Sequence, residues 1–250
     1  MLIYCLLIRV SCAPFTGMFF PNPLQMYDKL IVDSISLFLP TIIKELGYTA
    51  STAQLLTIPI YITAAVLAVA VAWFSDRQGQ RSPFILVCMS AIGIGFLICI
   101  TASGRGLPGL VYAGVFIAVC GIYPAFPGNV TWLSNNLAGS YKRSAGMAIQ
   151  IGVGNLGGGE FPFGGFRLGF TLNRNVAMAS NFYRKNDSPE YLLGHGLELA
   201  FVVVGTIAVL GMRFNYKRIN KKRDAVPLEH YADGDMSRLG DRAPTFRYVL

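Results

Sequence analysis

The sequence predicts an all-α integral membrane protein with several spans, and three observations support this class. Hydrophobic residues make up 53% of the 250 residues and charged residues only 14%, compared with about 25% charged in an average soluble protein. Residues 46–75, 82–104 and 106–141 contain no Asp, Glu, Lys or Arg. Each run is long enough to cross the roughly 30 Å hydrocarbon core of a bilayer as a helix. The composition therefore excludes an ordinary soluble protein.

The first half of the chain is expected to form three apolar helices. Leu30–Leu46 is a short stretch that Asp33 interrupts. Ala50–Phe74 is a strong span with Pro59 inside it, and Pro83–Ala102 is the next strong span. Proline is tolerated in a membrane helix where neighbouring groups satisfy the carbonyl that it leaves without a donor.

The second half is expected to add three more helices. Gly109–Leu133 is a strong span in which Pro124 and Pro127 predict a kink. Ala145–Gly158 is rich in glycine and too short to cross a bilayer by itself. Pro189–Phe214 is the last span, and it opens on a proline, which suits the first helical position.

The basic residues gather in three connections, at Ser75–Ser82, Ser134–Ser144 and Lys217–Arg223. Cytoplasmic loops of membrane proteins carry an excess of Lys and Arg, so these connections and the polar tail at 215–250 are expected to be cytoplasmic. The net charge of +8 fits such loops better than a nucleic-acid-binding face, and no nucleic-acid partner is predicted.

The most specific local motif is a tight loop containing Asp76, Arg77, Gly79 and Arg81. Glycine permits a sharp turn, and an acid beside two arginines can pair with helix ends or with a neighbouring helix. Such pairing would hold one conformation until it is broken. The alternative is that these residues are ordinary cytoplasmic loop charges.

No residues in the sequence combine into a recognisable catalytic or metal site. No H-E-x-x-H, no phosphate-binding glycine loop and no pairing of a nucleophile with a base is present. The five cysteines have no C-x-x-C spacing. We therefore predict that the chain is not an enzyme and that it binds no metal and no cofactor.

Several sequence segments resemble a known family. SISLFLPTIIKELGYTASTAQLLTIPIY and AWFSDRQGQRSPFI resemble the second half of a major facilitator superfamily transporter, most closely the fungal allantoate permease-like (anion:cation symporter) family. SNNLAGSYKRSAGMAIQIGVGNLGG and RFNYKRINKKRD…GDRAPTFRYVL are similar to the same family. The resemblance covers residues 34–158 and 177–250.

The resemblance implies a fold and a function. The fold would be the second six-helix half of the major facilitator bundle, helices seven to twelve, with a transmembrane half-bundle at 34–214. The loop Ser75–Arg81 would join the eighth and ninth helices. The function would be proton-coupled transport of small organic anions or vitamins by a multi-pass protein of the plasma membrane.

Two features depart from the family. Helices one to six are missing, and residues 1–33 form an atypical segment. Major facilitator carriers bind substrate between two halves, so one half cannot enclose a site. The alternative function is a non-transporting membrane fragment that associates with another half or with itself.

The second departure is the segment at residues 159–176, which interrupts the family-like sequence. Its 18 residues correspond to a multiple of three nucleotides, and its codons can contain splice-donor, branch-point and acceptor patterns. Our hypothesis is a retained intron, and the rival is a genuine loop insertion. Arg167 and Arg174 are costly at the centre of a bilayer, so the segment is expected to leave the membrane.

Three polar residues are candidates for the substrate cavity: Tyr61, Asn129 and Asn136. Asn129, Trp132 and Asn136 share a face at helical spacing. The alternative interpretations are that Tyr61 packs in the core, Trp132 anchors the helix at the membrane interface, and Asn136 ends the helix.

Glu198 is the candidate for proton coupling. It lies about 13 Å along the last predicted span, and a carboxylate within the membrane is a functional hypothesis by default. The alternative is a structural pair with His195, three residues earlier.

Overall fold

The computed structural model describes residues 39–156, except 41, 45–46 and 48, together with residues 191–225 and 240–250. These residues form helices and contain no strand, which confirms the predicted all-α class. The predicted first helix lies mostly outside the described residues, and so does the segment at 159–176. The helices are α4 (Ala50–Gln78), α5 (Ser82–Ser103), α6 (Pro108–Asn136), α7 (Ser140–Leu156), α8 (Leu192–Asp224) and the 3₁₀ helix η4 (Gly240–Arg242).

Four of these helices, α4, α5, α6 and α8, are long and apolar enough to cross a membrane. Helices α4, α5 and α6 overlap the three strong spans predicted from the sequence, and α8 overlaps the last predicted span. Helix α4 begins where the Thr49 hydroxyl accepts a hydrogen bond from the Thr52 N–H, a standard N-cap. It ends at Gly79, whose φ of 64° is left-handed. The loop therefore contains the sharp turn that was predicted from its glycine.

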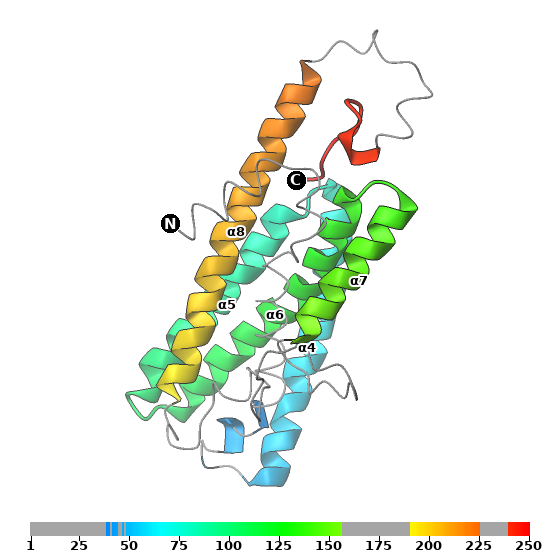
Figure 1. The fold of residues 1–250 in the computed structure, drawn as a ribbon. Helices are drawn as coiled ribbons and strands as arrows, with labels where there is room; N and C mark the ends of the chain where they lie inside the picture. The colour runs from blue at the N-terminus through cyan, green and yellow to red at the C-terminus, as the bar shows by residue number, and fades with distance from the viewer. Residues whose placement is uncertain (1–38, 41, 45–46, 48, 157–190, 226–239) are drawn as a thin grey trace, which may run out of the picture.

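The helices pack in a simple order (Figure 1). Helix α5 packs against both α6 and α8, and α4 packs against the other side of α6. Helix α7 also contacts α6. Only a small part of the apolar span of α4 is buried, because α6 is its main helical neighbour in the part of the chain that the structure describes.

The α5–α6 contact depends on glycine. A Cβ atom on Gly95 would lie 2.6 Å from both the Gly114 carbonyl oxygen and the Ala118 nitrogen. A Cβ on Gly121 would lie 2.7 Å from the Cys88 carbonyl oxygen. Small residues let membrane helices approach backbone to backbone. These glycines were not predicted from the sequence to form a helix contact.

Several helix ends differ from the sequence prediction, and helix α8 begins at Leu192, not at Pro189. Helix α7 starts at Ser140, five residues before the predicted start. Helix α8 continues to Asp224, ten residues beyond Phe214, so the first part of the polar tail is a helical extension of the last span. Lysine and arginine are good helix formers and suit a helix C-terminus, and the last turn of α8 contains three of them.

Candidate functional site

The three basic clusters of the sequence meet at one end of the bundle, which we call the basic end. A strap, defined as residues 240–250, links them there (Figure 1). The N–H of Arg81 donates to the Leu250 carbonyl, Lys142 pairs with Asp241, and Arg223 donates to strap carbonyls. The loops that the positive-inside rule places on one side of the membrane thus lie together in the structure.

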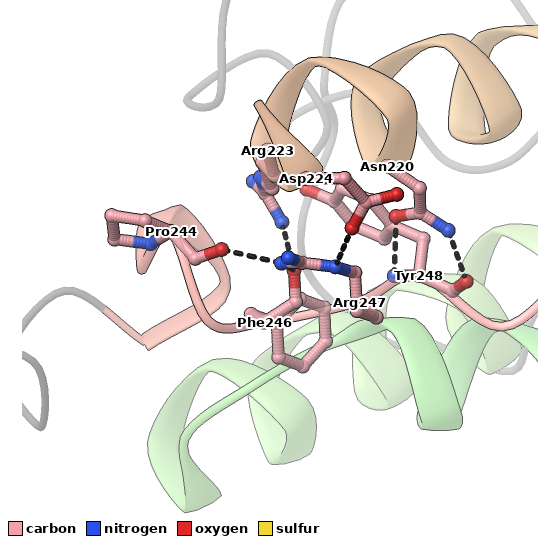
Figure 2. A network of polar contacts seen from close by, with 7 residues as sticks. All are labelled: Asn220, Arg223, Asp224, Pro244, Phe246, Arg247 and Tyr248. Atoms are coloured by element: carbon pink, nitrogen blue, oxygen red, sulfur yellow. Dashed lines mark hydrogen bonds and ion pairs between the residues drawn. The ribbon is translucent and has the colours of Figure 1, made fainter. Parts of the chain in front are cut away.

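The strap is held from one side by helix α8 (Figure 2). The Asn220 amide makes two hydrogen bonds to Tyr248, accepting from its N–H at 2.9 Å and donating to its carbonyl at 2.8 Å. The Arg223 guanidinium donates to the carbonyls of Phe246 and Asp241, at 2.8 and 2.7 Å. These side chains satisfy backbone groups of the strap, most of which lies outside any helix.

Helix α6 holds the next strap residue from another side. The Asn136 amide accepts from the Val249 N–H at 2.7 Å and donates to its carbonyl at 3.2 Å. The Trp132 indole N–H donates to the same carbonyl at 2.8 Å. Neighbouring residues of the strap, Tyr248 and Val249, thus bind two different helices.

The strap also contributes to the start of helix α5. The N–H groups of Arg81 and Ser82 donate to the Leu250 carbonyl at 2.6 and 3.3 Å. The first N–H groups of a helix have no partner within the helix, and no side chain caps α5. The Leu250 carbonyl therefore takes the place of an N-cap side chain as the acceptor at the start of α5.

Aromatic and ionic contacts surround these hydrogen bonds. Tyr248 stacks on Tyr216 at a centroid distance of 4.6 Å, and Arg223 lies 4.8 Å above the Tyr248 ring. Burial raises the pKa of the Tyr248 hydroxyl, the Asp241 carboxylate raises it further, and Arg223 lowers it. An unperturbed tyrosine has a pKa of about 10, so the stacked phenol is neutral at physiological pH.

Two ion pairs complete the strap contacts. Lys142 on α7 lies 2.5 Å from the Asp241 carboxylate, in a partly buried position. Arg247 lies 2.8 Å from the Asp224 carboxylate at the end of α8. The second pair is exposed, so solvent screens it and its contribution to stability is small.

The loop motif with Asp76, Arg77, Gly79 and Arg81 lies at the basic end of the bundle. Asp76 pairs with Arg81, while the Arg77 guanidinium lies 5.4 Å from the Trp73 ring centre. Gly79 provides the left-handed turn between the two helices. The motif thus contacts the strap through the backbone of Arg81, and its role in transport stays a prediction.

The structure does not bring the three candidate cavity residues together. Tyr61 on α4 packs edge-on against Tyr123 on α6, with centroids 5.7 Å apart. Asn129 is buried further along α6, and Asn136 lies at the strap. Thirteen residues separate Tyr123 from Asn136, which is about 20 Å along a helix. Their assignment to one cavity stays untested.

Trp132 differs from the interface anchor that was its alternative interpretation from the sequence. Its side chain is only 1% exposed, and its indole packs edge-on against Tyr216 at 5.8 Å. An interfacial tryptophan would present its ring to the headgroups. Trp132 instead belongs to the internal support of the strap.

A small cavity of about 50 Å³ lies between α4, α5 and α6. Most of its lining is apolar, and none of the three candidate cavity residues lines it. The residues that line it are Val71, Ala72, Ser75, Arg81, Phe84, Ile85, Cys88, Pro124, Pro127, Gly128 and Thr131.

Glu198 lies inside the bundle on α8. Its side chain is fully buried, and His195 on the same face is 1% exposed. His195 lies beside Phe96 of α5, with ring centres 6.0 Å apart. One turn beyond Glu198, Val202 faces Gly93, near the middle of α5. The structure therefore places this carboxyl group well within the span, and its role in coupling stays untested.

The four apolar spans define a multi-span helical membrane protein, and comparison with known proteins identifies its class. Residues 31–159, just over half of the chain, match the family described as sugar (and other) transporter. The chain belongs to this family of major facilitator superfamily transporters.

Curated fungal relatives support the same assignment. An uncharacterised transporter of Schizosaccharomyces pombe is 32% identical over 228 residues, which cover 90% of this chain and 41% of the relative. The high-affinity nicotinic acid transporter of Saccharomyces cerevisiae is 32% identical over 219 residues, covering 86% and 37%. An MFS-type transporter of Penicillium expansum is 30% identical over 223 residues, covering 87% and 40%.

The chain thus spans about two fifths of the length of these relatives. No solved structure matches it significantly.

Proposed function

We propose that this chain is the second half of a proton-coupled carrier of small organic anions, and that it transports only together with a first half. The observation that carries the proposal is the exposed apolar surface of α4. Leu55, Ile62, Val66 and Val69 are each more than 60% exposed. A surface of this kind needs lipid or another set of helices to cover it.

The similarity to a nicotinic acid transporter supports a small carboxylate as substrate. Nicotinate is a monocarboxylate of a size that a cavity between two helical halves can hold. The basic end is proposed to face the cytoplasm, because three basic clusters lie there and basic loops are retained on that side. The plasma membrane is the proposed location.

Glu198 is the proposed coupling residue. A carboxyl group surrounded by a helix bundle in lipid is costly when charged, so it can bind a proton in one conformation and release it in another. Its burial beside His195 supports this role. The Glu198 carboxyl group and the His195 ring together would form the proton-binding site.

Uptake of radiolabelled nicotinate into acid-driven proteoliposomes tests the proposal. The 250-residue chain alone is expected to give no uptake. A chimera with the first half of the yeast relative is expected to accumulate nicotinate when the outside is acidic. In the chimera, Glu198→Gln should abolish accumulation, while Glu198→Asp, which keeps the carboxyl group, should retain pH dependence at a lower rate.

Two results would contradict the proposal. Uptake by the chain alone would show that no first half is needed. Accumulation by the Glu198→Gln chimera with unchanged pH dependence would exclude this residue as the coupling group. The alternative function, a membrane fragment that pairs with itself, predicts a dimer of the chain and no uptake in either preparation.

A further inference from the structure

The part of α8 beyond the apolar span has two different faces. Tyr216, Asn220, Arg223 and Asp224 contact the strap. At 100° per residue they lie within a sector of about 100°. Four basic residues occupy the other sector, which is about 140° wide, and all four are exposed. These four residues, which we call the basic stripe, are Lys217, Arg218, Lys221 and Lys222.

The basic stripe continues the outward apolar face of the same helix. Four large apolar residues form this face and are about half exposed or more: Val203 (51%), Ile207 (60%), Leu210 (49%) and Phe214 (71%). By the helical repeat they project into the same sector as the basic stripe. An exposed apolar sector on a spanning helix is suited to contact with lipid chains, and the basic stripe lies at the end of this sector.

The length of the basic stripe matches the headgroup layer. Lys217 to Lys222 covers about 7.5 Å of helix, and the headgroup region on each side of a bilayer is about 5–7 Å thick. The stripe begins three residues after Phe214, the last exposed large apolar residue of α8 among those described. The position and length of the stripe therefore suit contact between the four cations and lipid phosphates.

The described acidic side chains at the strap pair with residues outside the basic stripe. Asp224 pairs with Arg247, and Asp241 pairs with Lys142. None of the four basic-stripe residues forms an ion pair with another described residue. Among the residues that the structure describes, the two acidic side chains at the strap, Asp224 and Asp241, are thus paired with other cations and not with the basic stripe.

We propose that the basic stripe binds the headgroups of anionic phospholipids in the leaflet at the basic end. Clusters of four or more basic residues next to a membrane helix attract anionic lipid. Lipid is favoured over a soluble anion because the stripe extends the exposed apolar face of a helix that is long and apolar enough to cross a membrane. The inference rests on membrane insertion and is independent of substrate and coupling.

Photo-crosslinking of the chain in lipid vesicles tests this proposal. Two preparations of phosphatidylcholine vesicles are compared. One contains a trace of photoactivatable phosphatidylserine and the other a trace of photoactivatable phosphatidylcholine, each with the photoactivatable group on an acyl chain. Peptide mapping gives the labelling ratio of the two lipids on α8 residues 203–214. We expect phosphatidylserine to be preferred about fivefold or more, the effect of one basic residue near the surface. Labelling of α4 provides an internal reference.

Variants assign the preference to the basic stripe. Replacing all four residues by glutamine should lower the ratio on α8 to that on α4, whereas arginine at the three lysines should preserve it. Lys44→Gln with Arg105→Gln, which removes exposed charge at the opposite end, should leave it unchanged. Millimolar inorganic phosphate should compete no better than sodium chloride of equal ionic strength.

Three results would overturn the proposal. The first is equal labelling by the two lipids in the unchanged chain. The second is an unaltered preference in the glutamine variant, with α4 labelling intact as evidence of folding. The third is specific competition by phosphate, which would identify a soluble anion as the occupant.

Discussion

Replacing Asn136 and Asn220 together by alanine is expected to release the strap from the basic end. Each amide makes two hydrogen bonds to one strap residue. At about 0.5–1.5 kcal/mol net for each bond, the double variant should lose about 2–6 kcal/mol of strap binding. Amide hydrogen exchange at Tyr248 and Val249 should then accelerate at least about 30-fold, because local opening governs exchange.

The chain contains a matched control for this experiment. Asn135 and Asn215 lie on the same two helices, and no hydrogen bond from either to the strap is present. Asn135→Ala with Asn215→Ala should leave exchange of the strap unchanged. Equal exchange rates in the two double variants, measured by mass spectrometry in detergent, would contradict the strap contacts described above.

Gly95→Ala is expected to destabilise the bundle, although alanine is the better helix former. The added Cβ would lie 2.6 Å from backbone atoms of Gly114 and Ala118, so α5 and α6 must separate. Overpacking of this kind costs about 1–3 kcal/mol. Thermal unfolding in detergent, followed by loss of helical circular dichroism, measures the change.

Gly93→Ala is the control, because it makes the same substitution two residues earlier on the same helix. Its Cβ would meet Val202 at 3.7 Å, an ordinary contact. Both variants gain the same helix propensity, about 1 kcal/mol, so their difference isolates the close approach of α5 and α6. Equal unfolding temperatures would contradict that approach.

The spans were predictable from the sequence because charge-free runs of this length have few other structures. Ala50, Pro83 and Gly109 were predicted as helix starts, and the helices begin within one residue of each position. The ends were less predictable. Helix α8 extends to Asp224, because the strap supports nearly three polar turns that periodicity alone would assign to a tail.

The strap was not predicted, for a physical reason. Its sequence has no hydrophobic periodicity. The residues that bind Val249 lie more than 100 positions earlier in the chain. The residues of GDRAPTFRYVL were noted only for their family resemblance. A useful signal was available in Asn136, whose side chain shares a helical face with Trp132. Both proved to bind Val249, a contact that no local pattern in the sequence could specify.

Labelling of single cysteines tests the central claim most directly, namely that the helices cross the membrane with the basic end on one side. Arg77→Cys, Lys222→Cys and Arg105→Cys are each placed in a chain whose five native cysteines are replaced by alanine. A membrane-impermeant maleimide should label position 105 in intact cells, and positions 77 and 222 only after permeabilisation. Labelling of positions 77 and 222 from opposite sides would contradict the account.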